Sequence, residues 1–475
     1  MNHKGIFFYL GLYSISVSIL SLLNILYSVY LHFNLNLISY FISLAVSLFI
    51  GLNLCFYGRD SNKNISSTDQ IVLIILTFFL LPLLISIPYF LSGYNISFIN
   101  SYFESVSGFT TTGFSILENI ERIDEPLLLW RSSSQWLGGF IFLIFAIGTL
   151  GSKYVKIKPS YLLSETNLLS NFYNNFTYNF IKIFLIYFFT TILVISFYTF
   201  SNIRLLDSFN LAFTTISSGG FLSKENLSDI IVNNYQTFAV SLTMLFPIFN
   251  FYLFFKIFSK QFKFKNHHED LHLGFLILFL ILFLNFFVVP NESIFTILLS
   301  VVSSLSTSGI STLNTNFDLS IFFLLLAIIG GSLLSSSSGL KYVRFYILLK
   351  ISHSEIYRLV KPINVFNKNL FNSESKINFD DAKIVFLVFI TFIVSIFVLS
   401  SILTFENLSF QNAFKLSILT LTNTVPSSLH GMNDVIFTDK SIFTKIFLII
   451  FMILGRIEII AVLFSIKKFI LKSWI

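Results

Sequence analysis

The sequence has little charge and almost no cysteine. Only 11% of its 475 residues are Asp, Glu, Lys or Arg, whereas 55% are hydrophobic, and the mean hydropathy is +0.81. This number of charged side chains is too small to cover the surface of a soluble domain. The composition therefore excludes a soluble globular protein. The single cysteine, Cys55, excludes an intramolecular disulfide and a metal site built from cysteine ligands.

Motifs of catalysis and of nucleotide binding are also missing. The sequence has no P-loop and no dinucleotide-binding fingerprint. The seven histidines do not gather as ligands, and His267 and His268 stand together in a segment that we expect to be a solvated loop. No nucleophile, base and orienting group converge as a catalytic site requires, so we expect no enzymatic activity.

Long apolar stretches are what the chain has instead. Residues 71–92, 271–290 and 384–403 are each at least 20 residues long and almost uncharged. A helix rises about 1.5 Å per residue, so each stretch can cross a hydrocarbon core of about 30 Å. The sequence therefore predicts an all-α polytopic membrane protein. The first stretch, 5–31, is too long for a cleaved signal peptide and is expected to be a retained helix.

The net charge of +7 is explained by the expected topology. The segments between helices fall into two alternating sets, and the set that contains the N-terminus, 341–380 and 466–475 holds 20 of the 30 Lys and Arg residues. Cytoplasmic loops carry such an excess, so we expect both termini in the cytoplasm. The basic excess therefore requires no nucleic-acid partner.

The same order of segments occurs four times after an opening hairpin of helices at 5–31 and 36–57. Each repeat has a spanning helix, a short apolar piece, a small polar loop and a second helix. The short pieces are 97–109, 205–216, 294–306 and 409–421, and the second helices are 127–150, 234–258, 320–350 and 442–466. The predicted division is a hairpin, 1–69, and four pore units, 70–177, 178–270, 271–380 and 381–475.

The short pieces predict four re-entrant loops around one axis. A helix of about 12 residues is too short to span a membrane. Non-helical backbone at that depth survives only where it is buried in protein or lines water. Four loops entering from the outer side predict a cation filter, in which backbone carbonyls replace the water around an ion. Any one loop alone would indicate no more than close helix packing.

The motifs in and around these loops resemble those of the Trk/Ktr/HKT potassium transporter superfamily, of the TrkH type. They are YFESVSGFTTTGFS (102–115), WRSSSQWLGG (130–139), AFTTISSGGF (212–221), SSLSTSGIST (303–312), GGSLLSSSSGLKYVR (330–344) and LGRIEI (454–459). The resemblance covers nearly the whole chain. It implies four pseudo-symmetric helix–pore-loop–helix units after the hairpin, and K⁺ uptake across the cytoplasmic membrane.

The resemblance also implies partners. It implies a homodimer in the lipid membrane and a cytosolic, nucleotide-binding regulatory subunit of the TrkA kind. The only bound group that it implies is K⁺, held by filter carbonyls, with no covalent cofactor.

Alignment on the family pattern gives the filter positions. They are Thr110, Thr111, Thr112 and Gly113; Ser217, Ser218, Gly219 and Gly220; Ser306, Thr307, Ser308 and Gly309; and Asn423, Thr424 and Val425. Val425 departs from the family, because a glycine is expected there. A β-branched residue with positive φ would be strained, so the fourth loop is expected to bend differently. The hypothesis that follows is weaker discrimination of K⁺ over Na⁺, which a Val425→Gly variant would restore.

The segment 330–339 is expected to be an intramembrane loop that obstructs the pore below the filter. By resemblance the gate residues are Gly330, Gly331, Ser335, Ser336, Gly339, Lys341 and Arg456. Leu334, Ser337 and Ser338 stand where the family has more glycine. Serine competes for backbone groups and can keep the segment non-helical. The alternative is an unbroken helix with a serine packing face.

Several charged residues have two readings. Arg456 lies in an apolar helix, where it either repels cations in the shut pore or forms a structural bridge with Glu458 or a carbonyl. Lys341 and Arg344 follow the loop, and snorkelling to the interface is their simpler explanation. Glu104 is expected to cap the first short helix. Acidic residues after the first filter loop either concentrate cations or are solvated; they are Glu118, Glu121, Asp124 and Glu125.

Three other functions remain open. The first is the same architecture carrying Na⁺ or both ions. A secondary transporter with inverted repeats is a second alternative, although its repeats would alternate in orientation. A receptor or structural membrane protein is the third, and it would leave the four loops without a purpose.

Overall fold

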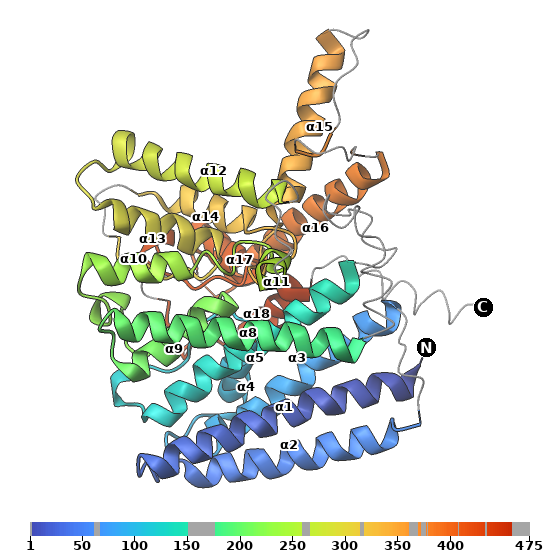
Figure 1. Ribbon diagram of the computed structural model, residues 1–475, viewed down its shortest axis with the longest axis vertical. Helices are drawn as coiled ribbons and strands as arrows, with labels where there is room; N and C mark the ends of the chain where they lie inside the picture. Colours follow the sequence, from blue (N-terminus) through green and yellow to red (C-terminus); the bar gives the residue numbers. More distant parts are fainter. Residues whose placement is uncertain are drawn as a thin grey trace.

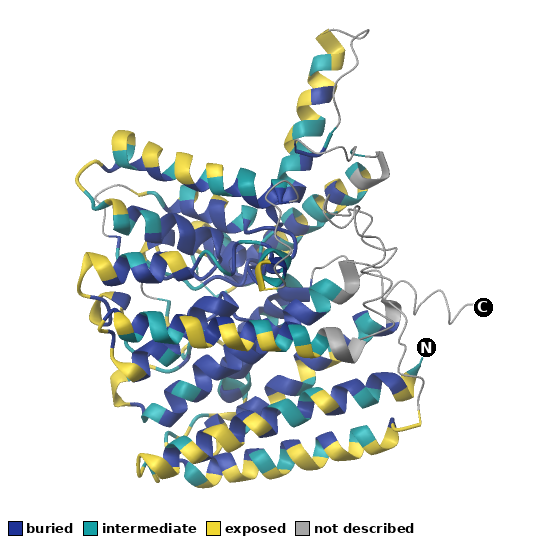
Figure 2. Cartoon of the chain, in the orientation of Figure 1, coloured by how far each residue is buried: buried dark blue, intermediate teal, exposed yellow. Residues whose placement is uncertain are grey.

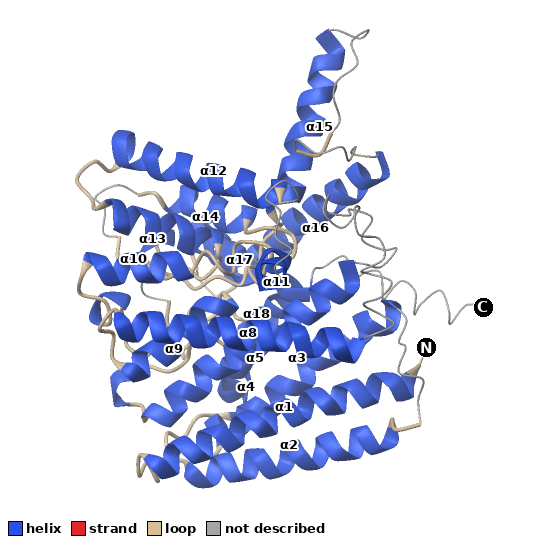
Figure 3. Cartoon of the chain, in the orientation of Figure 1, coloured by secondary structure: helices blue, strands red, loops and turns tan. Residues whose placement is uncertain are grey.

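The computed structural model describes most of the chain as helix. It describes residues 2–60, 67–150, 176–258, 267–313, 318–360, 369–371, 377, 379–406, 408–432 and 435–457. Within these ranges the regular elements are helices, and no β-strand is present (Figure 3). The all-α prediction is therefore confirmed.

The first two helices form the predicted hairpin along one edge of the molecule (Figure 1). They are α1 (His3–Tyr30) and α2 (Leu37–Tyr57). The backbones approach closely at two glycines, because a Cβ added at Gly11 would lie 2.7 Å from the Gly51 carbonyl oxygen. Ser21 and Ser43 also share a hydrogen bond of 3.0 Å across the hairpin. Small residues that admit close backbone contact are typical of helix pairs in membranes.

Four units follow, each opened by a long helix. The opening helices are α3 (Ser67–Phe90), α8 (Phe176–Phe200), α12 (His268–Phe283, continued by a π-turn to Val288) and α16 (Phe379–Thr404). These four and the hairpin helices are the six described helices long and apolar enough to cross a membrane. The division of the chain into units stays a prediction; each opening helix begins two or three residues before the expected boundary.

The four short helices lie within one residue of the predicted pieces. They are α4 (Phe98–Phe109), α9 (Leu205–Ser217), α13 (Ile294–Leu305) and α17 (Phe410–Leu421). Ser293 and Ser409 start the third and fourth, and each side chain accepts a hydrogen bond from a backbone amide of the first turn. Such caps satisfy amides that a helix start leaves unpaired. The third and fourth short helices therefore begin at a capping serine.

The second helices of the first and fourth units are continuous as predicted. They are α5 (Glu125–Leu150) and α18 (Ile442–Ile457), and the expected residues beyond 457 lie outside the described part of the chain.

The predicted helix 234–258 is wrong as a single element. It consists of α10 (Asn234–Thr243) and α11 (Phe251–Phe258), with irregular turns between them. Pro247 lies in this break and has no N–H to donate. The carbonyls of Pro247 and Ile248 accept hydrogen bonds of 3.2 and 2.8 Å from Ser337 and Ser332 of the third unit. The break between α10 and α11 therefore exposes carbonyls that bind residues 332–337 of the third unit.

The predicted helix 320–350 is interrupted where the intramembrane loop was expected. Helix α14 (Ser320–Ile329) ends before residues 330–341, and α15 (Tyr342–Val360) follows and projects away from the other helices (Figure 1). Gly330 and Gly339 have φ of 66° and 82°, which an α-helix does not permit. The alternative of an unbroken helix with a serine face is therefore wrong.

Exposure is confined to the outside of the bundle. Figure 2 shows buried residues around the short helices and exposed residues along α2, α8 and α12. The exposed side chains on these helices include large apolar ones such as Phe49, Phe189 and Phe279. Lipid is as apolar as these side chains, so this surface fits a bilayer. The polar interior instead gathers where the four loops meet.

Candidate ion pathway

The backbone after each short helix has the same conformation in all four units. Thr111, Ser218, Thr307 and Asn423 occupy equivalent places, and their φ values are 58°, 62°, 62° and 50°. Left-handed backbone is uncommon for residues other than glycine. Its occurrence at the same place in all four units therefore shows that the four loops share one backbone conformation.

Hydrogen bonds repeat with the same four-fold pattern. The amides of Thr112, Gly219, Ser308 and Thr424 donate to the carbonyls of Ser107, Thr214, Ser303 and Leu419, at 2.9, 2.8, 3.1 and 2.9 Å. Each bond runs from the loop back to the carbonyl five residues earlier. These loop amides are bonded to their own short helices, so they do not bond to the carbonyls of the neighbouring loops.

The four loops converge on one place. A Cβ added at Gly113 would lie 3.1 Å from Cα of Gly220, and one added at Gly220 would lie 2.8 Å from the carbonyl oxygen of Ser308. One added at Gly309 would lie 2.5 Å from the carbonyl oxygen of Val425. The predicted filter residues of all four units are therefore brought together, and they are buried except for Val425, which is partly exposed.

Val425 does not have the positive φ that would strain a β-branched residue. Gly113 and Gly309 have positive φ, 78° and 73°, but Val425 and Gly220 do not. The fourth loop therefore reaches its place without the left-handed conformation that a β-branched residue resists. What Val425 changes is the side chain, since a Cβ added at Gly113 or Gly220 would overlap its Cγ2 atom.

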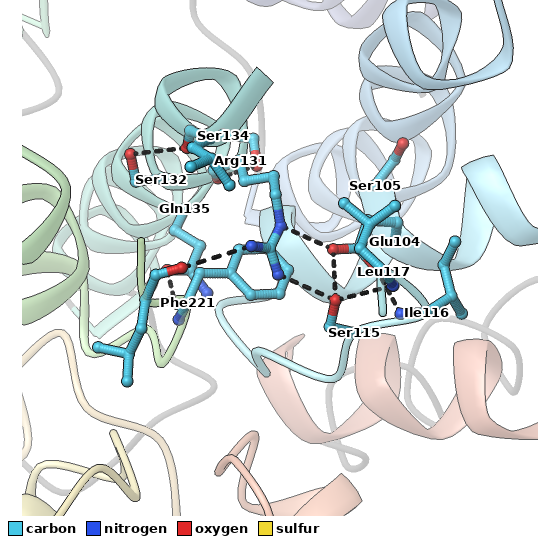
Figure 4. A network of polar contacts seen from close by, with 12 residues as sticks. Glu104, Ser105, Ser115, Ile116, Leu117, Arg131, Ser132, Ser134, Gln135 and Phe221 are labelled. Carbon is cyan, nitrogen blue, oxygen red and sulfur yellow. Dashed lines mark hydrogen bonds and ion pairs between the residues drawn. The ribbon is translucent and has the colours of Figure 1, made fainter. Parts of the chain in front are cut away.

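A buried ion pair supports the first loop from behind (Figure 4). Arg131 Nε donates to Glu104 Oε1 at 2.9 Å, and the residues are 1% and 0% exposed. Glu104 Oε2 accepts from the amide of Ile116 at 2.8 Å, and Arg131 Nη2 donates to Ser115 Oγ at 2.9 Å. The expectation that Glu104 caps α4 is wrong, because it lies mid-helix and holds the segment after the filter.

The same ion pair reaches the second loop. The guanidinium of Arg131 lies 4.2 Å from the ring centre of Phe221. Gln135, one helical turn further along α5, accepts from the Phe221 amide at 3.3 Å and from Thr214 Oγ1 at 3.1 Å. Residues of α5 therefore connect the first two loops (Figure 4). Sequence reasoning missed these roles, although two opposite charges in adjacent uncharged segments were an available signal.

The segment predicted to be the intramembrane loop, 330–339, lies directly against the predicted filter residues. Ser336 Oγ donates to the carbonyl of Ile216 at 3.0 Å, and the amide of Ser338 donates to Thr307 Oγ1 at 3.0 Å. Ser336 Oγ is also 3.4 Å from Ser218 Oγ. The serines of this loop thus bond to the predicted filter segments of the second and third units. These bonds were not predicted from the sequence.

Lys341 and Arg344 do not snorkel. They are 3% and 4% exposed, and Lys341 Nζ donates to the carbonyl and the hydroxyl of Ser335, each at 3.1 Å, and to the carbonyl of Ser337. Arg344 Nη1 donates to the carbonyl of Leu340 at 3.5 Å. The lysine binds carbonyls that a non-helical loop leaves without helical partners, so it stabilises the folded loop.

Arg456 reaches the same loop from the fourth unit. It is 1% exposed, Nη1 donates to Ser338 Oγ at 2.6 Å, and the guanidinium lies 4.0 Å from the ring centre of Phe142. Within the part of the chain that the structure describes, its Nε and Nη2 atoms are buried with no hydrogen-bond partner. The proposed bridge to Glu458 falls outside the described residues. Arg456 therefore places a positive charge beside the loop and the filter.

The acidic residues after the first loop are mostly tied to other segments. Asp124 Oδ1 accepts from Asn36 Nδ2 and Tyr94 Oη, each at 2.8 Å, and burial raises the pKa of this carboxyl. Glu125 pairs with Arg204 and accepts from Tyr27. Neither residue is a plainly solvated loop residue, as one reading from the sequence held, and both join the hairpin and the second unit to the first.

His430 lies behind the fourth loop, in a short turn after the filter. It is fully buried, and its Nδ1 atom is 3.2 Å from Ser427 Oγ. Burial lowers the pKa of the imidazole to about 3, so it is neutral at physiological pH. Within the described residues, no group of three or more His, Cys, Asp or Glu side chains is placed to hold a metal ion.

No family model matches the chain, but known proteins do. An uncharacterized cation transporter of Methanocaldococcus jannaschii is 26% identical over 399 residues, which cover 81% of this chain and 77% of that one. The Trk system potassium uptake protein TrkG of Escherichia coli is 25% identical over 465 residues, 92% of each chain.

A solved structure has the same fold. The potassium transporter TrkH of Vibrio parahaemolyticus superposes with a TM-score of 0.83 at 23% identity and covers 98% of both chains. The Trk system potassium uptake protein TrkH of Halomonas elongata is 24% identical over 448 residues, 89% of this chain and 90% of that one.

Proposed function

Because the chain belongs to the Trk/Ktr/HKT transporter superfamily and has the TrkH type of fold, we propose that it is the ion-translocating subunit of a potassium uptake system in the cytoplasmic membrane. The observation that carries this proposal is the four-fold repetition of left-handed backbone and loop-to-helix hydrogen bonds where the loops meet. A single axis bounded by four equivalent loops suits a ring of ligands around an ion. The relatives are transport proteins, and we expect no enzymatic activity.

The loop carbonyls are the proposed ligands of K⁺. A K⁺ ion sheds its water where backbone oxygens replace it, and this needs carbonyls that are held in place. The loop amides are already bonded to Ser107, Thr214, Ser303 and Leu419, so the carbonyls do not depend on the ion to order them. The short helices direct the negative ends of their dipoles toward the same place, which favours a cation.

The intramembrane loop is the proposed gate. It lies against the filter segments of the second and third units and is bonded by Lys341 and by Arg456 from the fourth unit. Arg456 adds a positive charge on the path that a cation would take below the filter. Opening would require these bonds to break together, so we expect the gate to have two discrete positions.

Partners and orientation follow from the family as proposals. We propose a homodimer with cytoplasmic termini and a TrkA-like cytosolic regulator. Helix α15 projects from the bundle with exposed apolar residues at its far end, Ile356, Leu359 and Val360. A helix that leaves the bundle directly after the gate loop would carry a regulator's movement to the gate.

A pathway for Na⁺ or for both ions is the second candidate. Val425 favours it, because this valine stands where the other three units have a glycine, namely Gly113, Gly220 and Gly309. An inverted-repeat transporter is less well supported, since all four loops follow their short helices with one and the same backbone pattern.

Uptake of ⁸⁶Rb⁺ into K⁺-loaded liposomes containing the purified protein tests this proposal. We expect uptake, and we expect external K⁺ to compete with it. Equal competition by Na⁺ would replace the K⁺ assignment by a general monovalent cation pathway. No uptake above that of protein-free liposomes, with the proposed regulator absent and present, would contradict the function.

A further inference from the structure

The glycine layer of the filter contains a hydrocarbon side chain. Gly113, Gly220 and Gly309 come from the first three units, and Val425 takes the fourth place. Side chains added at Gly113 and Gly220 would both overlap the same atom, Cγ2 of Val425. One methyl group therefore lies against the glycines of two other units at once.

The position of that methyl group relative to the axis follows from these contacts. Gly113, Gly220, Gly309 and Val425 stand at equivalent places in four units arranged around one axis, so the space between them is the axis itself. The methyl group touches Gly113 and Gly220, while the carbonyl oxygen of Val425 lies by Gly309. Val425 is thus in contact with all three other loops, and its side chain lies where an ion at this level would be.

This side chain has no ready alternative position. A β-branched side chain is stiff at χ1. The neighbouring residues are also fixed, because Thr424 donates its amide to Leu419 at 2.9 Å and Asn423 Nδ2 donates to Thr112 Oγ1 at 2.8 Å and to the carbonyl of Met452 at 2.9 Å. The methyl group can leave the axis only if Val425 changes its restricted χ1 rotamer or the fourth loop moves.

We propose that Val425 forms a hydrophobic constriction inside the filter, which a dehydrated monovalent cation must displace in order to pass. The inference rests on the proposed cation pathway and adds a second barrier to it, above the intramembrane loop. Apolar constrictions impede ions because methyl groups offer no ligand in exchange for water. The constriction is a property of the Val425 side chain and not of its backbone, whose φ is ordinary.

The test compares side chains of graded size at one position. We would measure initial ⁸⁶Rb⁺ uptake into K⁺-loaded liposomes for wild type, Val425→Ala, Val425→Gly and Val425→Ile. We expect uptake to rise in the order Ile, Val, Ala, Gly, and Val425→Gly to exceed wild type by about tenfold, which a barrier lowered by about 1.4 kcal/mol would produce. Val302→Ala is the control, because Val302 is a buried valine of α13, four residues before the third loop, and lies outside the predicted filter positions.

A second readout does not depend on the intramembrane loop. A carbonyl layer freed of the methyl group is expected to bind K⁺, which stabilises the folded state as the K⁺ concentration rises. We would therefore measure the K⁺-dependent rise in unfolding temperature of the purified variants, with a larger rise for Val425→Gly than for wild type and Val302→Ala.

The outcomes separate the constriction from the pathway. A graded increase in either uptake or K⁺-dependent stabilisation supports the constriction. Wild-type uptake with no change in either quantity for Val425→Ala and Val425→Gly overturns it and leaves the proposed function intact. Absence of uptake and of K⁺-dependent stabilisation in every variant contradicts the proposed function itself.

Discussion

Single residues hold the loops of the proposed filter in place. Glu104 and Arg131 illustrate this, because they place two opposite charges in a dry interior directly behind the first loop. A buried charge without its partner destabilises the folded protein, so the two residues act as a pair. Loss of the pair would also release the groups to which it is hydrogen-bonded. Those groups are Ser115 and the Ile116 amide, two and three residues after Gly113, the last residue of the first filter segment.

Glu104→Gln should destabilise the folded protein strongly. The substitution leaves Arg131 buried without its counter-charge, and breaking a buried pair costs about 3–5 kcal/mol. Thermal unfolding in detergent would show a clearly lower midpoint than wild type. Glu118→Gln is the control, since Glu118 has a hydrogen bond to Thr438 at an exposed site. Equal midpoints for the two variants would contradict the role given to the ion pair.

His430 predicts a dependence of stability on acidity. Burial lowers the pKa of this imidazole to about 3, from an ordinary value of 6.5. The unfolded chain therefore binds a proton below about pH 6.5 that the folded protein rejects, so stability is lost as the pH falls from there toward 3. Between pH 7 and pH 5 the loss from this group should be about 2 kcal/mol.

The measurement is the unfolding temperature of wild type and His430→Gln over this pH range. The variant cannot titrate at this position, so its unfolding temperature should fall less on acidification. Parallel curves for the two proteins would show that His430 is not the group responsible.

At the scale of elements, the prediction from sequence succeeds where local signals suffice. The four short helices are found within one residue, because each is a short apolar piece between a spanning helix and a small polar loop. The break between α10 and α11 was missed although Pro247 lies in it. Proline alone does not predict a break, since α3 contains Pro82 and Pro88 and continues through both. The break depends on Ser332 and Ser337, about 85 to 90 residues away, which bond to the carbonyls it exposes.

The intramembrane loop shows the same limit. Its position was predicted from glycine and serine, but its bonds to Ile216 and Thr307 join segments that are far apart in sequence. The contacts of Lys341 could likewise not be predicted from the sequence. A lysine after a membrane segment ordinarily snorkels, and only the folded loop shows the carbonyls that bind it.

Lys341→Met should loosen the gate loop and increase cation flux. Methionine has nearly the length of lysine but donates no hydrogen bond, so the carbonyls of Ser335 and Ser337 lose their partner. We expect ⁸⁶Rb⁺ uptake in the absence of a regulator to exceed that of wild type several-fold, as removal of about 1 kcal/mol of closed-state stabilisation would produce.

Lys350→Met provides the control for that experiment. Lys350 lies in α15, the helix that begins directly after Lys341, and donates to the carbonyl of Asn369 instead of to the loop. Similar uptake by wild type and both variants would show that Lys341 does not hold the gate closed.

At the scale of the whole molecule, the hairpin and the four units form one connected body. The hairpin is joined to the first unit by Asn24, whose Nδ2 donates to the Pro126 carbonyl at 3.0 Å, and by Asn36, which bonds to Asp124. The first unit is joined to the second through α5, and the third to the second through the broken helix. The general architecture could be predicted from the order of segments. These contacts between units could not, because each one pairs residues that are distant in sequence.

Crystals of the protein containing Tl⁺ test the central claim most directly, because anomalous scattering locates this K⁺-like ion. The account predicts Tl⁺ on the axis between the four loops, beside the carbonyls of the left-handed residues Thr111, Ser218, Thr307 and Asn423. It predicts no Tl⁺ at the level of Val425. Tl⁺ bound only away from these loops, or centred at the Val425 methyl group with the valine in place, would contradict the account.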